Sequence, residues 1–107
     1  MKIKDGVVLA GLDPRMRLVL VVADNLWRLL GHDLVVTAGT DGTHSAGSLH
    51  YFGLAVDLRT RYFSDNGGLA ASPLRQILRA VDKRFDVVVE TNHIHVELDA
   101  LESAHNH

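Results

Sequence analysis

The sequence predicts an α+β domain in which two helices back a small, largely antiparallel sheet. Two segments carry the start signals of helices, and four short runs have the apolar and β-branched character of strands. This order mixes helices with largely antiparallel strands, which is typical of the α+β class. The chain has 107 residues with no internal repeat and no linker-like tract, so we expect one domain over residues 1–107.

The first helix is expected to begin at Pro14. Asp13 before it is a good N-cap residue, and proline suits the first helical position. The helix should run to about Leu30 and stop at Gly31. Its apolar stripe should face the core, and the stripe consists of Leu18, Val22, Leu26, Leu29 and Leu30.

Two strands are expected next. The run 33–39 (DLVVTAG) forms the first, and a loop rich in glycine and threonine ends it. The segment 53–61 (GLAVDLRTR) forms the second strand. The following stretch, 64–72, contains a glycine pair and is expected to be a loop.

The second helix is expected to begin at Ser72 and Pro73, which repeat the N-cap and first-position signal, and to continue to about Lys83. Two further strands, 84–90 and 93–98, follow it. Only two residues separate them, so we expect a tight hairpin.

Composition and charge exclude several classes of protein. The chain is 47% hydrophobic and 22% charged, as ordinary globular domains are, and its net charge of -2 offers no basic footprint for nucleic acid. No segment approaches the ~20 apolar residues of a membrane span, and the apolar run near the N-terminus is too short for a signal peptide. We therefore expect synthesis in the cytoplasm and favour a monomer, although the oligomeric state is not predicted. Residues 99–107 are expected to fray.

Strand alternation predicts where the polar residues of the strands gather. Successive side chains of a strand point to opposite faces, so Asp57 is separated from its apolar neighbours, as are His93 and His95 in the last strand. If both apolar faces meet the helices, these three side chains lie on one side of the sheet. His50 stands at the entrance to the Asp57 strand.

Such a cluster suits a metal. The chain has no cysteine, so disulfides and thiolate zinc sites are excluded and only histidine and carboxylate ligands remain. The small residues Gly53 and Ala55 should leave room for ligands to converge, and three protein ligands would leave a fourth position for water. Each side chain alone also has a simpler explanation. His95 could be a strand histidine that faces solvent, and His50 could close a loop. Asp57 could form an ion pair with Arg59 or Arg61. Together they favour a shared metal, because half-buried polar groups need partners.

Two motifs resemble a known family. Residues 48–57 (SLHYFGLAVD) match the S-x-H-x-x-G-x-A-x-D signature of zinc D-alanyl-D-alanine carboxypeptidases and L-alanyl-D-glutamate endopeptidases, the M15 peptidases. The later HIH matches the H-x-H of the same superfamily, which includes lysostaphin-type endopeptidases and the amino-terminal domain of hedgehog proteins. The resemblance spans about residues 34–98 and implies a fold like that of hedgehog and the D-Ala-D-Ala peptidases.

The resemblance also implies roles for single residues. His50 and Asp57 resemble the first two zinc ligands, and His95, the second histidine of H-x-H, resembles the third. His93 then resembles the companion histidine that steadies the oxyanion or helps proton transfer. Glu90 is the expected catalytic acid. It stands three residues before the third ligand if His93 is that ligand, and farther upstream if His95 is that ligand. The simpler explanation is a glutamate that faces water at the end of the strand.

Further residues are expected around this site. Ser48 occupies the serine of the signature, where a hydroxyl can fix the orientation of a ligand. Family members often carry an arginine before the first ligand, where it polarises the scissile carbonyl or holds the substrate carboxylate. This chain has no arginine in the strand before His50. Arg59 and Arg61 are the candidates to replace it, and Arg59 is the expected substrate contact. Glu97 is expected to be solvated or to support a ligand, and His44 to be an exposed loop residue.

The function that the resemblance implies is zinc-dependent hydrolysis of peptide bonds in the stem peptide of peptidoglycan. Whether the enzyme is a carboxypeptidase or an endopeptidase stays open. A lysin-like phage enzyme, or another released protein, would act at the cell wall. The alternatives are a non-catalytic, zinc-stabilised binding module of the same fold, and a metal-free domain whose cluster is held by hydrogen bonds alone.

Overall fold

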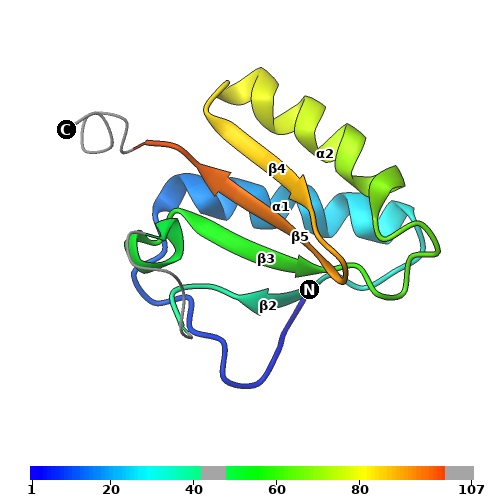
Figure 1. Ribbon diagram of the computed structural model, residues 1–107, viewed down its shortest axis with the longest axis horizontal. Helices are drawn as coiled ribbons and strands as arrows, with labels where there is room; N and C mark the ends of the chain where they lie inside the picture. Colours follow the sequence, from blue (N-terminus) through cyan, green and yellow to red (C-terminus); the bar gives the residue numbers. More distant parts are fainter. Residues whose placement is uncertain (42–47, 101–107) are drawn as a thin grey trace.

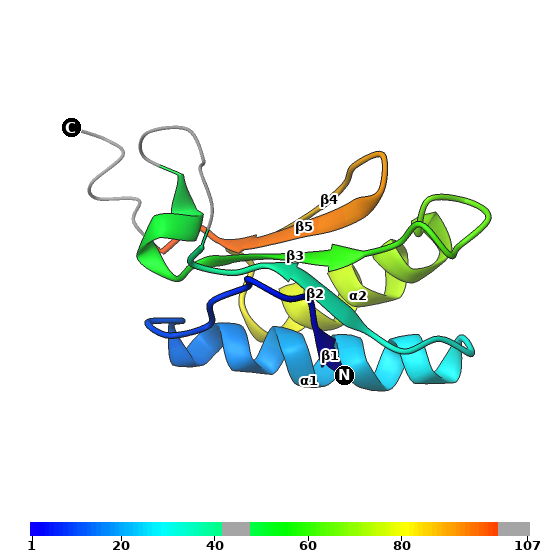
Figure 2. The same ribbon diagram turned by 90° about the horizontal axis from the view of Figure 1, so that it is seen from below.

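Five strands form one sheet in the computed structural model, which describes residues 1–41 and 48–100. The strand order across the sheet is β1-β2-β3-β5-β4; Figure 1 shows β2, β3, β5 and β4 in this order, and Figure 2 labels β1. Along the chain the elements are β1 (Lys2–Ile3), α1 (Pro14–Leu29), β2 (Val35–Ala38), the short 3-10 helix η1 (Leu49–Phe52), β3 (Ala55–Arg59), α2 (Gly68–Val81), β4 (Phe85–Val89) and β5 (His93–Leu98).

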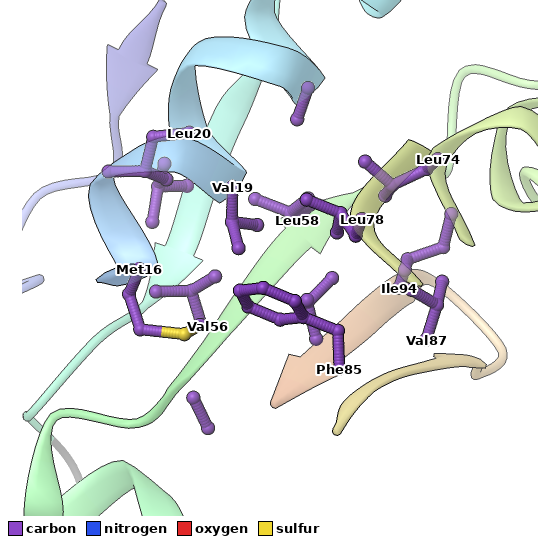
Figure 3. Packing of buried hydrophobic residues seen from close by; sticks show 14 of the residues in the cluster. Met16, Val19, Leu20, Val56, Leu58, Leu74, Leu78, Phe85, Val87 and Ile94 are labelled. Carbon is purple, nitrogen blue, oxygen red and sulfur yellow. The ribbon is translucent and has the colours of Figure 1, made fainter. Parts of the chain in front are cut away.

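Both long helices cover one face of the sheet, and η1 lies at one end on the other side (Figure 2). The core fills the space between helices and sheet, because each strand turns its apolar residues toward α1 and α2. Figure 3 shows this packing around Phe85, which is 1% exposed. The largest fully buried side chains are Trp27, Phe85, Met16, Leu34, Leu58, Leu74, Leu78, Ile94, Leu98, Val19, Val36 and Val56. The polar side chains of β3 and β5 lie on the opposite face of the sheet.

Helix α1 begins as predicted, but its buried face differs from the predicted stripe. Asp13 caps the helix by accepting a hydrogen bond from the backbone N–H of Arg15, and Pro14 is the first helical residue. Leu29 is 85% exposed, so its place in the apolar stripe was wrong. The residues that are buried instead follow a spacing of three and four: Met16, Val19, Leu20, Ala23 and Trp27. Trp27 is fully buried on this face, and its indole N–H donates to the Arg59 carbonyl at 3.2 Å.

Helix α2 begins earlier than predicted. The segment expected to be a loop already contains its first turn, and Pro73 lies inside the helix rather than at its start. The Asp65 carboxylate accepts hydrogen bonds from the backbone N–H groups of Gly67 and Leu69, which satisfies donors at this end. Burial of Ala70 against the core stabilises the same turn.

The sheet is mixed, which corrects the expectation of a largely antiparallel sheet. The two-residue strand β1 runs parallel to β2, and the other three pairings are antiparallel. The hairpin predicted from 84–90 and 93–98 is confirmed as β4 and β5. A two-residue strand has no alternation that a sequence pattern could reveal.

Gly53 has a different purpose from the one expected. It was predicted to leave room for ligands, but it ends η1 in the left-handed region, with φ of 70°. A Cβ at Gly53 would lie 2.2 Å from the carbonyl oxygen of Gly11. Gly53 is therefore required by the close approach of the chain segment that precedes α1.

Two expectations about the chain as a whole meet the structure only in part. None of the helices among the described residues has both the length and the apolar character to cross a membrane.

The first residues of the tail that was expected to fray are anchored. The Asp99 N–H donates to the Arg84 carbonyl, and Ala100 packs against the core. The rest of that tail and His44 lie outside the described residues.

Candidate metal centre

Strand register brings the predicted ligands to the outer face of the sheet, away from the helices. Asp57 in β3 lies directly opposite His95 in β5, and Arg59 lies opposite His93. The residues that alternate with them, such as Leu58, are buried against the helices. The prediction that Asp57, His93 and His95 share one face of the sheet is confirmed.

His50 reaches the same place from η1. Ser48 caps this 3-10 helix, and its Oγ accepts a hydrogen bond from the His50 backbone N–H at 3.3 Å. His50 is 3% exposed, and its Nε2 lies 3.4 Å from Asp57 Oδ1. Ser48 therefore orients the histidine through its main chain rather than through its ring.

A backbone carbonyl fixes the proton on the His50 ring. Nδ1 lies 2.9 Å from the Gly39 carbonyl oxygen, which can only accept a hydrogen bond. Nε2 is therefore the nitrogen that faces Asp57: the protonated ring donates a hydrogen bond to that carboxylate, and the neutral ring carries its lone pair there. Gly39 itself is held closely, since a Cβ there would lie 2.3 Å from the Val8 carbonyl oxygen. Metal-ligating histidines are typically oriented in this way, with the second nitrogen bonded to an acceptor.

His95 is held between two carboxylates. Its Nδ1 donates to Asp57 Oδ1 at 2.9 Å, and its Nε2 donates to Glu97 Oε1 at 2.8 Å. The hydrogen bond with Asp57 raises the pKa of His95. Burial lowers this pKa and the hydrogen bond with Glu97 raises it, so that the pKa of His95 lies above its ordinary value of 6.5. Glu97 was expected to be solvated or supporting, and the contact shows that it supports the ring. The sequence pattern indicates this contact, because His95 and Glu97 are two residues apart on one strand and therefore share a face of the sheet.

Asp57 is ionised at the centre of this group. Burial raises the pKa of Asp57, but hydrogen bonds with His50 and His95 lower it by more, so the pKa lies well below the usual range. Its side chain is 15% exposed. A permanently charged, mostly buried carboxylate between two imidazoles is a strong attractor for a cation.

The separations fit a metal ion. The ligand atoms that His50, Asp57 and His95 offer lie within 4.8 Å of one another. In a tetrahedral site with bonds of about 2.0–2.2 Å, neighbouring ligand atoms are ~3.4 Å apart. His50 Nε2 and Asp57 Oδ1 are separated by 3.4 Å, and the shorter contact of 2.9 Å is the hydrogen bond whose proton a metal would displace. These three residues could therefore hold a divalent metal ion.

His93 lies beside the three ligands and is oriented by its neighbour. Its Nδ1 donates to Asn92 Oδ1 at 2.8 Å, so the neutral ring carries its lone pair on Nε2. That Nε2 lies 3.8 Å from Asp57 Oδ2. His93 therefore presents Nε2 at the edge of the cluster.

Glu90 lies farther away. It is exposed at the turn between β4 and β5, and its backbone N–H donates to the His93 carbonyl at 2.8 Å. This pairing puts Glu90 across from His93 in the ladder, and therefore on the same face of the sheet. Among the described hydrogen bonds and ion pairs, none joins the Glu90 side chain to the cluster.

Comparison of the chain with known protein families and with curated proteins found no match in either. The likeness of residues 48–57 to the M15 signature therefore stays a prediction.

Binding of zinc to this centre is expected to release about one proton and to weaken as the pH falls. The raised pKa of His95 keeps its ring protonated to a pH above 6.5, and the metal must displace the Nδ1 proton. Below that pKa the affinity should fall about tenfold per pH unit, because one proton competes for one ligand atom. Calorimetric titration in two buffers of different ionisation enthalpy measures the proton release. An affinity equal at about pH 6 and about pH 8 would contradict this assignment of the ligands.

Proposed function

We propose that the protein is a zinc-dependent peptidase that hydrolyses peptide bonds in the stem peptide of peptidoglycan, on a hedgehog-like fold. The observation that carries the proposal is the cluster of His50, Asp57 and His95, in which the second nitrogen of each histidine is bonded to an acceptor. These residues also occupy the ligand positions of the M15 signature that the sequence resembles.

The donor set supports zinc as the metal. Two imidazoles and a carboxylate suit zinc, and three protein ligands are the number that catalytic zinc sites use. When bound, zinc would polarise the scissile carbonyl and lower the pKa of a water molecule.

The surrounding residues supply proton transfer and orientation. The lone pair on His93 Nε2 faces the cluster, so this ring can take a proton and return it to the leaving amine. Glu90 is the second proposed catalytic residue, placed across from His93 at the strand end. Glu97 is already bonded to His95 and holds that ring in place.

The test is hydrolysis of purified stem peptides by the protein and by three variants. His93→Ala and Glu90→Gln are expected to keep their zinc and to lose turnover by about 10²–10⁴-fold, the usual contribution of general acid–base catalysis. Asp86→Asn is the matched control: Asp86 is an exposed acid of β4 that lies opposite Glu97, on the same face of the sheet. Its activity should equal that of the unaltered protein.

The same experiment separates the alternatives. A non-catalytic binding module would bind one zinc and stem peptides without cleaving them, and Glu90→Gln would change nothing. A metal-free domain would retain no zinc at all, with His95 held only by Asp57 and Glu97. Either result would refute the peptidase.

A further inference from the structure

The two edge strands of the sheet, β1 and β4, differ in how much backbone they leave open. β1 has only two residues, which offers little for another strand to join. β4 has five residues, and no strand among the described residues pairs with its outer side. Figure 1 shows α2 lying next to this strand, and the two elements are in contact. β4 is therefore the edge at which a second chain could add to the sheet.

The sequence of β4 favours pairing with another strand. Its five residues, FDVVV, are aromatic or β-branched apart from Asp86. Val88 and Val89 are 44% and 40% exposed, on opposite faces of the strand. Segments with high β-propensity and little charge tend to pair with copies of themselves when their edge is open. An edge of this composition is a hazard unless something covers its backbone groups.

Alternation decides which backbone groups of β4 face outward. At one end the Arg84 carbonyl accepts a hydrogen bond from the Asp99 N–H. At the other end the Glu90 N–H donates to the His93 carbonyl. The even-numbered residues of this stretch therefore face β5, and those between them face away from it. The residues with outward N–H and C=O groups are Phe85, Val87 and Val89.

Two arginines of α2 already occupy this edge. Arg79 Nη1 donates to the Phe85 carbonyl at 2.8 Å. Arg75 Nη2 donates to the Val87 carbonyl at 2.7 Å. Residues four apart on a helix are separated by about 6 Å along its axis, close to the ~6.8 Å between alternate residues of a strand. Because the donors are charged, these hydrogen bonds are stronger than those of an incoming backbone N–H.

We infer that Arg75 and Arg79 block the edge of β4 against pairing with a second copy of this chain. The partner strand is an antiparallel copy of β4, because a two-fold axis lets the same residues pair on both sides. That strand needs the carbonyls of Phe85 and Val87 as acceptors, and the guanidinium groups hold both of them. The inference is independent of the proposed peptidase function, since no proposed metal ligand takes part.

Removing both guanidinium groups tests the inference. Arg75→Ala/Arg79→Ala should dimerise at least about tenfold more tightly than the unaltered protein in sedimentation equilibrium. The amides of Val87 and Val89 should exchange with deuterium at least about tenfold more slowly in this dimer than in the unaltered protein. Both arginines are exposed, so circular dichroism should show an unchanged fold. Each single variant keeps one arginine bond and gives the same test with a smaller effect if the double variant does not fold.

The matched control is Arg17→Ala/Arg28→Ala, which removes two exposed arginines from α1 and changes the net charge equally. It should leave dimerisation and exchange unchanged. Val89→Pro, added to the double variant of α2, removes an outward N–H without touching the ladder to β5. It should return dimerisation to that of the unaltered protein.

Arginines that only attach α2 to the sheet predict a different result. Their removal would then lower stability but leave dimerisation and the exchange of the β4 amides as they are. That outcome, equal dimerisation of the α1 control, or a dimer that survives Val89→Pro would each overturn the inference.

Discussion

Replacing Asp57 with alanine is expected to abolish metal binding and, with it, the proposed peptidase activity. Asp57 supplies the only carboxylate among the three proposed ligands and contacts both His50 and His95. Zinc sites with four protein ligands bind with about 10–16 kcal/mol, so one ligand is worth ~3 kcal/mol, or at least a hundredfold in affinity. Metal analysis after gel filtration should find no stoichiometric zinc in this variant.

The control for this change is Asp86→Ala. Asp86 is exposed and lies on the same face of the sheet, but its carboxylate contacts Arg79 rather than a histidine. This variant should keep its zinc, and circular dichroism should show that both variants are folded. An Asp57→Ala protein that retains one zinc per chain would show that the metal is held elsewhere.

Truncation of Leu78 is expected to give a large loss of stability. Leu78 in α2 is fully buried between the helix and the sheet, so Leu78→Ala removes packed methyl groups and leaves a cavity (Figure 3). Such changes cost about 2–5 kcal/mol. In a domain whose total free energy of unfolding is about 5–15 kcal/mol, this is a substantial fraction.

The matched control is Leu29→Ala, because the two substitutions remove the same atoms. Leu29 is 85% exposed at the end of α1, so the change should alter the free energy of unfolding by less than about 0.5 kcal/mol. Urea denaturation of both variants measures the difference. Equal destabilisation would mean that Leu29 packs in the core as the sequence pattern suggested, against the observed orientation of α1.

The face that carries the candidate site could be predicted because alternation is strict in both of its strands. Leu58 and Ile94 are buried against the helices, so Asp57 and His95 must point the other way, and period-two geometry needs no tertiary information. The start of α1 was equally accessible, since the Asp13 cap is a local interaction.

Other features depend on contacts between distant segments. The Ser72-Pro73 signal predicted a helix start, but burial of Ala70 and the Asp65 cap begin α2 earlier. A pocket brings Lys4, which follows β1, next to Arg59 of β3 and His93 of β5, and no local pattern connects these positions. The tautomer of His50 is set by Gly39, which is eleven residues away.

The fold separates stability from chemistry. One face of the sheet packs against α1 and α2 (Figure 2). The other face presents the His50, Asp57 and His95 cluster. Ligands borne on paired strands are held by the ladder hydrogen bonds, which gives the centre a rigid base.

The most direct test of this account is the metal content of the purified, untagged protein, measured before and after chelation and again after zinc is added back. We predict one zinc per chain, removed by the chelator, restored by added zinc and lost in His50→Ala. A protein that holds no metal as purified and takes up none from added zinc would contradict the metal centre, and with it the proposed peptidase.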